Sequence, residues 1–188
     1  MSFTFEPLEI PDVVLVRPKR HHDGRGWFME QFRQSAFLEA GIDVRFVQDN
    51  AVRSTGGVLR GMHFQLDPAP QGKLVSVLRG RVFDVAVDIR TGSPTFGRWV
   101  GRTLDEEEGA GLWIPEGFAH GYCVLSEGAD VTYKVTAEYR ADLDRGFRWD
   151  DPDVGIEWPV ETPVLSDRDA DLPALSEIGS PFARGVRG

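Results

Sequence analysis

The stretch at residues 59–65, LRGMHFQ, places an arginine and a histidine three positions apart in a segment with the composition of a strand. Histidine accepts and releases protons near neutral pH and arginine can hold an anion, so His63 and Arg60 could serve acid–base chemistry on a phosphorylated ligand. Strict alternation along a strand puts them on opposite faces. A shared cavity therefore requires a bulge, which we predict at Gly61. Taken alone, His63 is more simply explained as a structural histidine.

A second histidine, His120, lies in the segment PEGFAHG at residues 115–121. The pattern Pro-x-Gly-x-x-His resembles the second signature of the cupin superfamily, which implies a double-sheet β-barrel. Metal-binding cupins usually carry His-x-His in the first signature, whereas this chain has Gln65 two residues after His63. Because zinc and iron sites generally need three or four protein ligands, we predict no catalytic metal.

Two tyrosines and a late aspartate are further candidates. Alternation within residues 131–139 puts Tyr133 and Tyr139 on one face, where they either pack in the core or line a cavity of the barrel. Arg168 and Asp169 are adjacent, and in isolation they read as a surface ion pair. Asp169 matters for chemistry only if the chain returns it to a histidine.

Short strand-like runs separated by glycine and proline predict that these residues are positioned by a mainly β protein with few short helices. The clearest runs are residues 13–16, 44–48, 58–64, 73–78, 82–89, 99–104 and 131–139. Within residues 82–89, Asp84 and Asp88 lie opposite the apolar face. Gly80 predicts a tight hairpin that pairs the two runs flanking it. A helix is predicted at residues 30–40, ending before Gly41. The tail from about residue 174 either covers the barrel or frays.

Composition sets broad limits. The 188 residues are 41% hydrophobic and fit a single domain spanning residues 1–188. One cysteine rules out an internal disulfide and favours the cytoplasm. The net charge of −9 opposes nucleic-acid binding, and we expect a protein with neither signal peptide nor membrane span.

Several segments together resemble the dTDP-4-dehydrorhamnose 3,5-epimerase family over roughly residues 5–175. They are RGMHFQ (60–65), QGK (71–73), DVAVDIR (84–90), GSPTFG (92–97), PEGFAHG (115–121), WDDP (149–152), GIEWP (155–159) and LSDRD (165–169). The ordered set of motifs is more specific than any one of them. The resemblance implies a cofactor-independent isomerase that takes a dTDP-sugar and forms a homodimer, in which an N-terminal strand pairs with the partner's sheet.

The resemblance also implies roles for individual residues. His63 matches the general base, Asp169 its partner, Tyr133 the general acid and Lys73 a group near the sugar carbonyl. His120 matches a polar position near the same carbonyl, with Asp84 as its partner. Substrate-contact positions are matched by Arg25, Glu30, Gln48, Asn50, Arg60, Tyr139, Asp144 and Arg168. The family often has Tyr, Glu and Lys where this chain has Phe64, Asp144 and Arg168, which bears on fine specificity.

The implied reaction inverts C3 and C5 of dTDP-4-dehydro-6-deoxy-D-glucose, giving dTDP-4-dehydro-L-rhamnose for dTDP-L-rhamnose biosynthesis. Both carbons are alpha to the C4 ketone, so a positioned base and a stabilised enolate are needed at each. The alternatives are a 3- or 5-mono-epimerase, a non-catalytic sugar-nucleotide-binding cupin, an isomerase that moves the ketone, and a metal-dependent oxygenase. Motifs alone leave open whether both carbon centres are inverted, which nucleotide base the substrate carries and which sugar the pathway finally makes.

Overall fold

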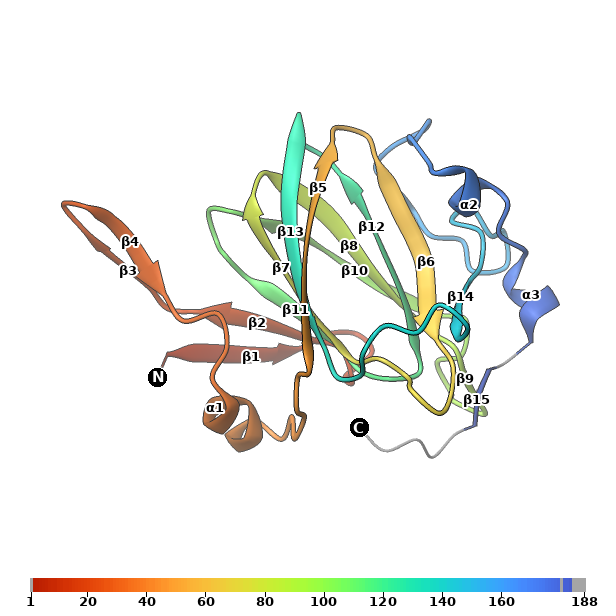
Figure 1. The fold of residues 1–188 in the computed structure, drawn as a ribbon, viewed down its shortest axis with the longest axis horizontal. Coiled ribbons are helices and arrows are strands. Elements are labelled where there is room, and N and C mark those ends of the chain that lie inside the picture. Colours follow the sequence, from red (N-terminus) through yellow and green to blue (C-terminus); the bar gives the residue numbers. More distant parts are fainter. Residues whose placement is uncertain (1, 180, 184–188) are drawn as a thin grey trace.

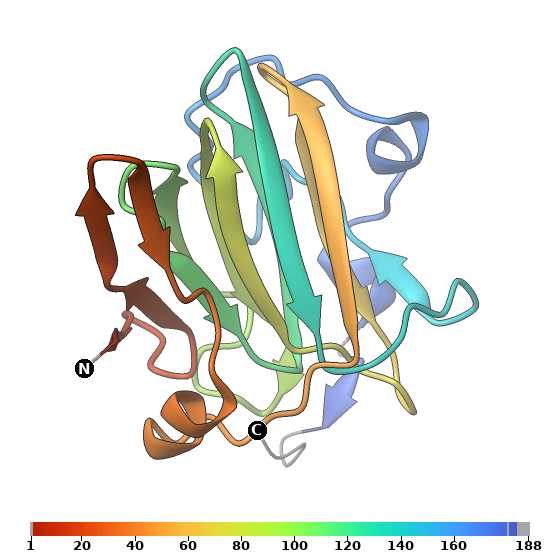
Figure 2. The same cartoon turned by 60° about the vertical axis from the view of Figure 1, so that its left-hand side comes forward.

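Two antiparallel sheets dominate the computed structural model, which describes residues 2–179 and 181–183 (Figure 1). The larger sheet has six strands, in the order β1 (Phe3–Pro7), β2 (Val14–Pro18), β11 (Gly111–Ile114), β7 (Lys73–Arg79), β13 (Gly128–Val135) and β5 (Gln48–Thr55). The smaller has five, in the order β10 (Trp99–Asp105), β8 (Arg81–Asp88), β12 (Phe118–Val124), β6 (Leu59–Gln65) and β14 (Asp144–Gly146). The predicted mainly β, double-sheet barrel is confirmed, and Figure 2 turns the larger sheet toward the viewer.

The main core lies between the two sheets. Val75 and Leu112 of the larger sheet pack with Val82 and Ala86 of β8 in one buried cluster. The neighbouring positions of β8, including Val85, point to the opposite side and join a second cluster. Alternation along β8 therefore separates Asp84 from the face of Val85, as predicted. The structure adds that the face of Asp84 is the inner one, where Asp84 bonds to His120.

Both outer faces of the barrel are covered by chain that is not in the main sheets. The helix α1 (Gln34–Glu39) packs Phe37 against the larger sheet beside Trp113. Beyond the smaller sheet lie α2 (Asp167–Ala170), α3 (Leu175–Ile178) and the short parallel pair β9 (Arg90–Thr91) and β15 (Phe182–Ala183). Leu175 and Phe182 are buried there, so the described part of the tail covers the barrel. No helix in the described ranges is long and apolar enough to cross a membrane.

Three local predictions are corrected. Residues 44–47 are not a strand, because Val44 and Phe46 pack on the outer cluster and the ladder begins only at Gln48. The run at residues 131–139 leaves its sheet after Val135, so Tyr139 is not on the strand of Tyr133. The predicted helix at residues 30–40 is shorter, beginning at Gln34, with no side chain capping its N-terminus.

The fourth correction concerns the turn at Gly80. The glycine does form a turn, with φ of +79°, but β7 and β8 do not pair. Instead β7 lies between β11 and β13 in the larger sheet, whereas β8 lies between β10 and β12 in the smaller one. A tight turn can thus pass from one layer of a double-sheet barrel to the other.

The predicted irregularity at Gly61 is confirmed. His120 pairs with His63 and Tyr122 pairs with Arg60, so β6 uses one more residue than β12 between these pairs. Gly61 has φ of +138°, and a Cβ there would lie 2.5 Å from the Cα of Gly121. Only glycine fits this bulge, which changes the direction of the side chains on either side of it.

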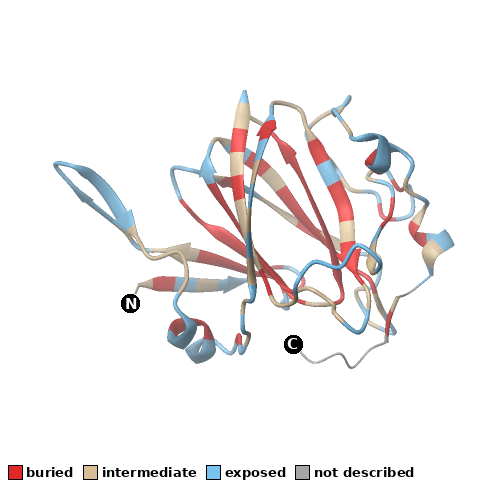
Figure 3. Cartoon of the chain, in the orientation of Figure 1, coloured by how far each residue is buried: buried red, intermediate tan, exposed pale blue. Residues whose placement is uncertain are grey.

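A hairpin of β3 (Arg20–Asp23) and β4 (Gly26–Met29) projects away from the barrel and is largely exposed (Figures 1 and 3). Trp27 and Phe28 are 50% and 66% exposed. Arg20 anchors the base of the hairpin by donating to the carbonyls of Glu106 and Glu107, each at 2.7 Å. Its guanidinium also lies 4.1 Å from the ring centroid of Trp27, so the hairpin is held in place without a partner.

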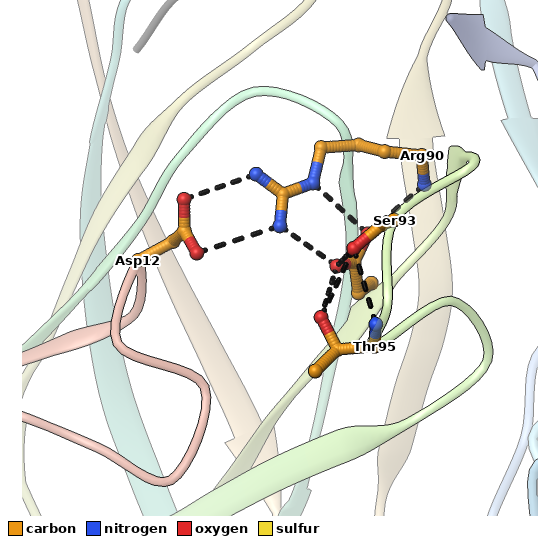
Figure 4. A network of polar contacts seen from close by, with 5 residues as sticks. Asp12, Arg90, Ser93 and Thr95 are labelled. Carbon is orange, nitrogen blue, oxygen red and sulfur yellow. Dashed lines mark hydrogen bonds and ion pairs between the residues drawn. The ribbon is translucent and has the colours of Figure 1, made fainter. Parts of the chain in front are cut away.

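An ionic network centred on the buried Asp88 joins the end of β8 to the turn between β1 and β2 (Figure 4). The guanidinium of Arg90 donates to both oxygens of Asp88 and reaches Asp12 at 3.0 Å. The hydroxyls of Ser93 and Thr95 donate to Asp88 at 2.6 Å each. Burial opposes ionisation, but hydrogen bonds from Arg90, Ser93 and Thr95 prevail and hold the pKa of Asp88 below its ordinary value.

We expect Asp88→Asn to lower the free energy of unfolding by about 3 kcal/mol, because Arg90 would lose its buried counter-charge. Asp130→Asn is the control, since its pair with Arg53 is exposed to solvent and should change the free energy of unfolding far less. Because the pKa of Asp88 is depressed on folding, its contribution is present at neutral pH and is lost as the pH falls below about 4. Urea unfolding measures both; equal losses in the two variants would contradict the prediction.

Candidate active site

The candidate site is a cavity of about 460 Å³ between the two sheets. Its walls come from β5, β7 and β13 on one side, from β6, β12 and β14 on the other, and from α2. The lining residues are Gln48, Asn50, Val52, Arg60, His63, Phe64, Gln65, Gln71, Lys73, His120, Tyr122, Tyr133, Tyr139, Asp144, Ser166, Arg168 and Asp169. The bulge at Gly61 lets Arg60 and His63 share this cavity, as predicted.

His63 and Asp169 form a pair across β6 and α2. The Nε2 atom of His63 lies 2.8 Å from Oδ1 of Asp169, whose carboxylate is buried. Burial alone would raise the pKa of Asp169, but the hydrogen bond and charge of His63, with the Ser166 hydroxyl and the Gly61 N–H, hold it below its ordinary value. The carboxylate therefore stays ionised beside the imidazole and favours a proton on Nε2.

The other ring nitrogen of His63, Nδ1, is buried and has no hydrogen-bond partner among the described residues. With Nε2 donating to Asp169, neutral His63 keeps its free lone pair on Nδ1. A free lone pair is one requirement of a general base, and reach to the substrate is the other. Nδ1 is buried beside Gly146, so the ring must turn to present this atom to the cavity. The late aspartate thus returns to a histidine, which was the condition for a chemical role.

Tyr133 comes from the opposite wall, on β13 of the larger sheet. Burial raises the pKa of its phenol, an effect that the nearby Arg60 guanidinium only partly offsets. The hydroxyl is therefore protonated at neutral pH and available as a donor. His63 on β6 and Tyr133 on β13 place a proton acceptor and a proton donor on facing sheets.

Lys73 and His120 complete the inner end of the cavity. The Nζ of Lys73 reaches the carbonyl of His63 at 3.5 Å. Burial lowers the pKa of Lys73 to about 8, although the carboxylates of Asp144 and Asp84 work in the other direction. His120 Nε2 lies 2.9 Å from Oδ2 of the fully buried Asp84, so the predicted partnership of these two residues is present.

Lys73 predicts an alkaline limit to activity. The family resemblance places Lys73 near the sugar carbonyl. In that role only the protonated ammonium would stabilise a negative oxygen, so kcat should fall as the pH rises through about 8. Lys73→Arg keeps its positive charge above that pH, so its kcat should not fall there, although its maximal kcat should be lower. The pH profile of kcat is measured for both proteins. The same alkaline fall in Lys73→Arg would show that another group causes it.

The mouth of the cavity is crossed by a polar bridge. Asp144 Oδ2 accepts from the Tyr139 hydroxyl at 3.0 Å and lies 2.7 Å from the guanidinium of Arg168. Tyr139 is 54% exposed, so one face of an aromatic ring is accessible there. Because Asp144 bonds both partners, the three side chains hold one another across separate segments.

Arg60 is presented to the cavity by residues that sequence reasoning missed. Its Nε donates to Ser54 at 3.0 Å, and the Ser54 hydroxyl lies 3.5 Å from that of Tyr122. Tyr122 lies two positions after His120 on β12, so alternation would have indicated it if residues 118–124 had been recognised as a strand. Gln48 and Asn50, predicted as substrate contacts, also line the cavity.

Two predicted substrate contacts lie outside this cavity. Arg25 is at the tip of the projecting hairpin, with a side chain 91% exposed and paired with Asp23 at 2.6 Å. Glu30 follows β4 and lies 3.5 Å from Arg33. Neither is among the lining residues, so this chain alone does not bring them to the site.

The described residues contain no group of three or more His, Cys, Asp or Glu side chains that could hold a metal ion. His63 and His120 each bond to a different carboxylate. The lack of a catalytic metal stays a prediction, which metal analysis of the purified protein tests.

A double-sheet barrel whose cavity pairs a histidine–carboxylate dyad with a facing tyrosine defines a cupin-type isomerase that works by proton transfer. The family model of dTDP-4-dehydrorhamnose 3,5-epimerase matches residues 7–177, and the chain belongs to this family. The dTDP-4-dehydrorhamnose 3,5-epimerase of Shigella flexneri is 57% identical over 162 residues, which are 86% of this chain and 90% of that protein.

Two other relatives are informative about fold and specificity. The crystal structure of a dTDP-6-deoxy-D-glucose-3,5-epimerase from Legionella pneumophila, in complex with dTDP-4-keto-L-rhamnose, is 48% identical, covers 94% of each chain and superposes with a TM-score of 0.91. The dTDP-4-dehydrorhamnose 3-epimerase of Streptomyces niveus is 40% identical and covers 91% of this chain and 83% of its own. Relatives of this chain are thus named both as 3,5-epimerases and as a 3-epimerase.

Proposed function

We propose that this chain inverts C3 and C5 of dTDP-4-dehydro-6-deoxy-D-glucose to give dTDP-4-dehydro-L-rhamnose, without a cofactor, in dTDP-L-rhamnose biosynthesis. The observation that carries the proposal is the position of His63 and Tyr133 on facing sheets of one cavity. Inversion requires a proton to leave one face of a carbon and another to arrive on the opposite face, which two groups on opposite walls can do.

The steps follow from the chemistry of each group. His63 removes the proton alpha to the C4 ketone, and Asp169 stabilises the resulting imidazolium. The Lys73 ammonium, with His120 beside it, stabilises the enolate oxygen that develops at C4. Tyr133 returns a proton from the other side. A movement of the sugar ring then presents the second alpha carbon to the same groups.

The outer part of the cavity suits the nucleotide diphosphate. Arg60 and Arg168 supply positive charge for the phosphates, despite the net charge of −9 on the chain. Gln48, Asn50 and Asp144 supply amide and carboxylate groups for hydrogen bonds, and Tyr139 supplies an exposed ring for stacking on the base. We assign the substrate-contact roles on this basis.

Proton NMR of dTDP-4-keto-6-deoxy-D-glucose incubated with the protein in deuterium oxide tests the proposal. Exchange at both C3 and C5 supports the double epimerase, and exchange at one position selects a mono-epimerase. No exchange would leave a binding role or another substrate. The presence of an acid and a base in one cavity speaks against a binding role, which needs neither.

A homodimer is part of the proposal, and the hairpin is its contact. Trp27 and Phe28 are exposed apolar side chains on a hairpin already held in place by Arg20. A partner's hairpin would bring Arg25 and Glu30 to the cavity that this chain leaves without them. A cytoplasmic location belongs to the same proposal and accords with the free, buried Cys123.

We expect Arg25→Ala and His63→Asn to complement one another in mixed dimers. Each homodimer lacks one required group per site, whereas half the sites of a heterodimer combine intact His63 with the partner's Arg25. Co-expression should therefore restore at least about tenfold more activity than either variant alone, since each loss acts on one site. Unrestored activity in verified heterodimers, or a monomer by light scattering, would overturn the shared site.

A further inference from the structure

Tyr139 stands on a segment with no sheet to hold it. The strand β13 ends at Val135 and β14 begins at Asp144, and no helix or strand lies between them. The ring of Tyr139 is at the cavity mouth and half exposed. A residue in such a loop keeps a defined position only if other groups bind the loop's backbone.

The side chain of Gln65 binds this backbone on both sides of Tyr139. Its Nε2 donates to the carbonyl of Glu138 at 3.0 Å, and its Oε1 accepts from the amide of Arg140 at 2.7 Å. The second hydrogen of Nε2 is donated to the carbonyl of Ala69. Gln48 adds to the clamp, because its Oε1 accepts from the amide of Tyr139 itself at 2.8 Å.

These contacts need a primary amide at position 65. Two carbonyls require two N–H donors, and one backbone amide requires an acceptor, a combination that neither a carboxylate nor a single imidazole tautomer supplies. The residue is 3% exposed, and replacing it by an acid would place a carboxylate against two carbonyl oxygens. Although Gln65 lines the cavity, its hydrogen-bonding groups are already engaged by the protein.

We propose that Gln65 is a positioning residue that sets nucleotide affinity by holding Tyr139 at the cavity mouth. The inference rests on the proposed function, in which the Tyr139 ring stacks on the nucleotide base. Gln65 acts on the loop and not on the reacting carbons, so it governs binding of the nucleotide part more than proton transfer. Gln65 thus stands where metal-binding cupins have the second histidine of the His-x-His pattern, and it binds a loop instead of a metal.

Calorimetric titration with dTDP tests the proposal. The full-length variants are Gln65→Met, Gln65→Glu, Tyr139→Ala, and each Gln65 substitution combined with Tyr139→Ala. We expect each Gln65 variant to raise Kd for dTDP and KM for the sugar nucleotide about tenfold, with kcat changed less than about threefold. In the Tyr139→Ala background the same changes should alter Kd less than about twofold. Equal effects in both backgrounds, or a loss confined to kcat, would overturn the proposal.

Amide hydrogen exchange provides a second, ligand-free measurement. In Gln65→Met the amide of Arg140 loses its acceptor, so its exchange should be at least about tenfold faster than in the unchanged protein. Gln34→Met is the control, since it loses a side-chain bond to the Val44 carbonyl far from the cavity. Unchanged exchange at Arg140 overturns the inference. If the protein without substitutions does not bind dTDP, the proposed function is wrong. The amide exchange of Arg140 then still tests whether Gln65 holds the loop.

Discussion

His63→Asn is expected to lower deuterium incorporation at C3 and C5 by about 10²–10⁴-fold, the usual contribution of a general base. Asparagine occupies similar space and can still face Asp169, but it cannot take up a proton. The measurement is the proton NMR assay in deuterium oxide at saturating substrate. Binding of dTDP should be nearly unchanged, because the diphosphate is assigned to Arg60 and Arg168 and not to His63.

Asp169→Asn is the companion variant. An amide can still accept from Nε2 of His63, but it cannot stabilise the imidazolium, so a loss of about 10²-fold or more is expected. Incorporation at near-normal rates in either variant would show that another group removes the proton. Circular dichroism and dTDP titration distinguish a chemical loss from misfolding in both cases.

Tyr133→Phe should separate proton removal from proton return. His63 would still take the alpha proton, and deuterium could return from the same side with retention. We expect epimerised product to fall by about 10²-fold or more, while deuterium incorporation into unreacted substrate falls far less. The ratio of exchange to inversion, read from the same spectra, should therefore rise.

Tyr122→Phe is the matched control for that experiment. Tyr122 is a second cavity tyrosine whose pKa is raised by burial, but its hydroxyl lies beside Ser54. Its ratio of exchange to inversion should stay near that of the unchanged protein. Parallel losses of exchange and inversion in Tyr133→Phe would count against its role as the proton donor and assign it to binding.

Local sequence was sufficient for several properties that depend on neighbours along the chain. Alternation separated Asp84 from the face of Val85 on β8, and glycine identified the bulge at Gly61 and the turn at Gly80, since each reflects backbone geometry within a few residues. The family motifs added residues far apart in sequence, and the structure brings most of them to one cavity. The variants above test their roles.

Pairing across distance needed the folded chain. Alternation within β7 and β8 is the same whether they share a sheet or lie in opposite layers, so only competition among all strands decided it. Tyr139 lines the cavity through loop contacts to Gln48 and Gln65, which no periodicity predicts. The contact between His63 and Asp169 also depends on tertiary structure. Asp169 follows His63 by more than a hundred residues, and its short helix α2 packs against β6.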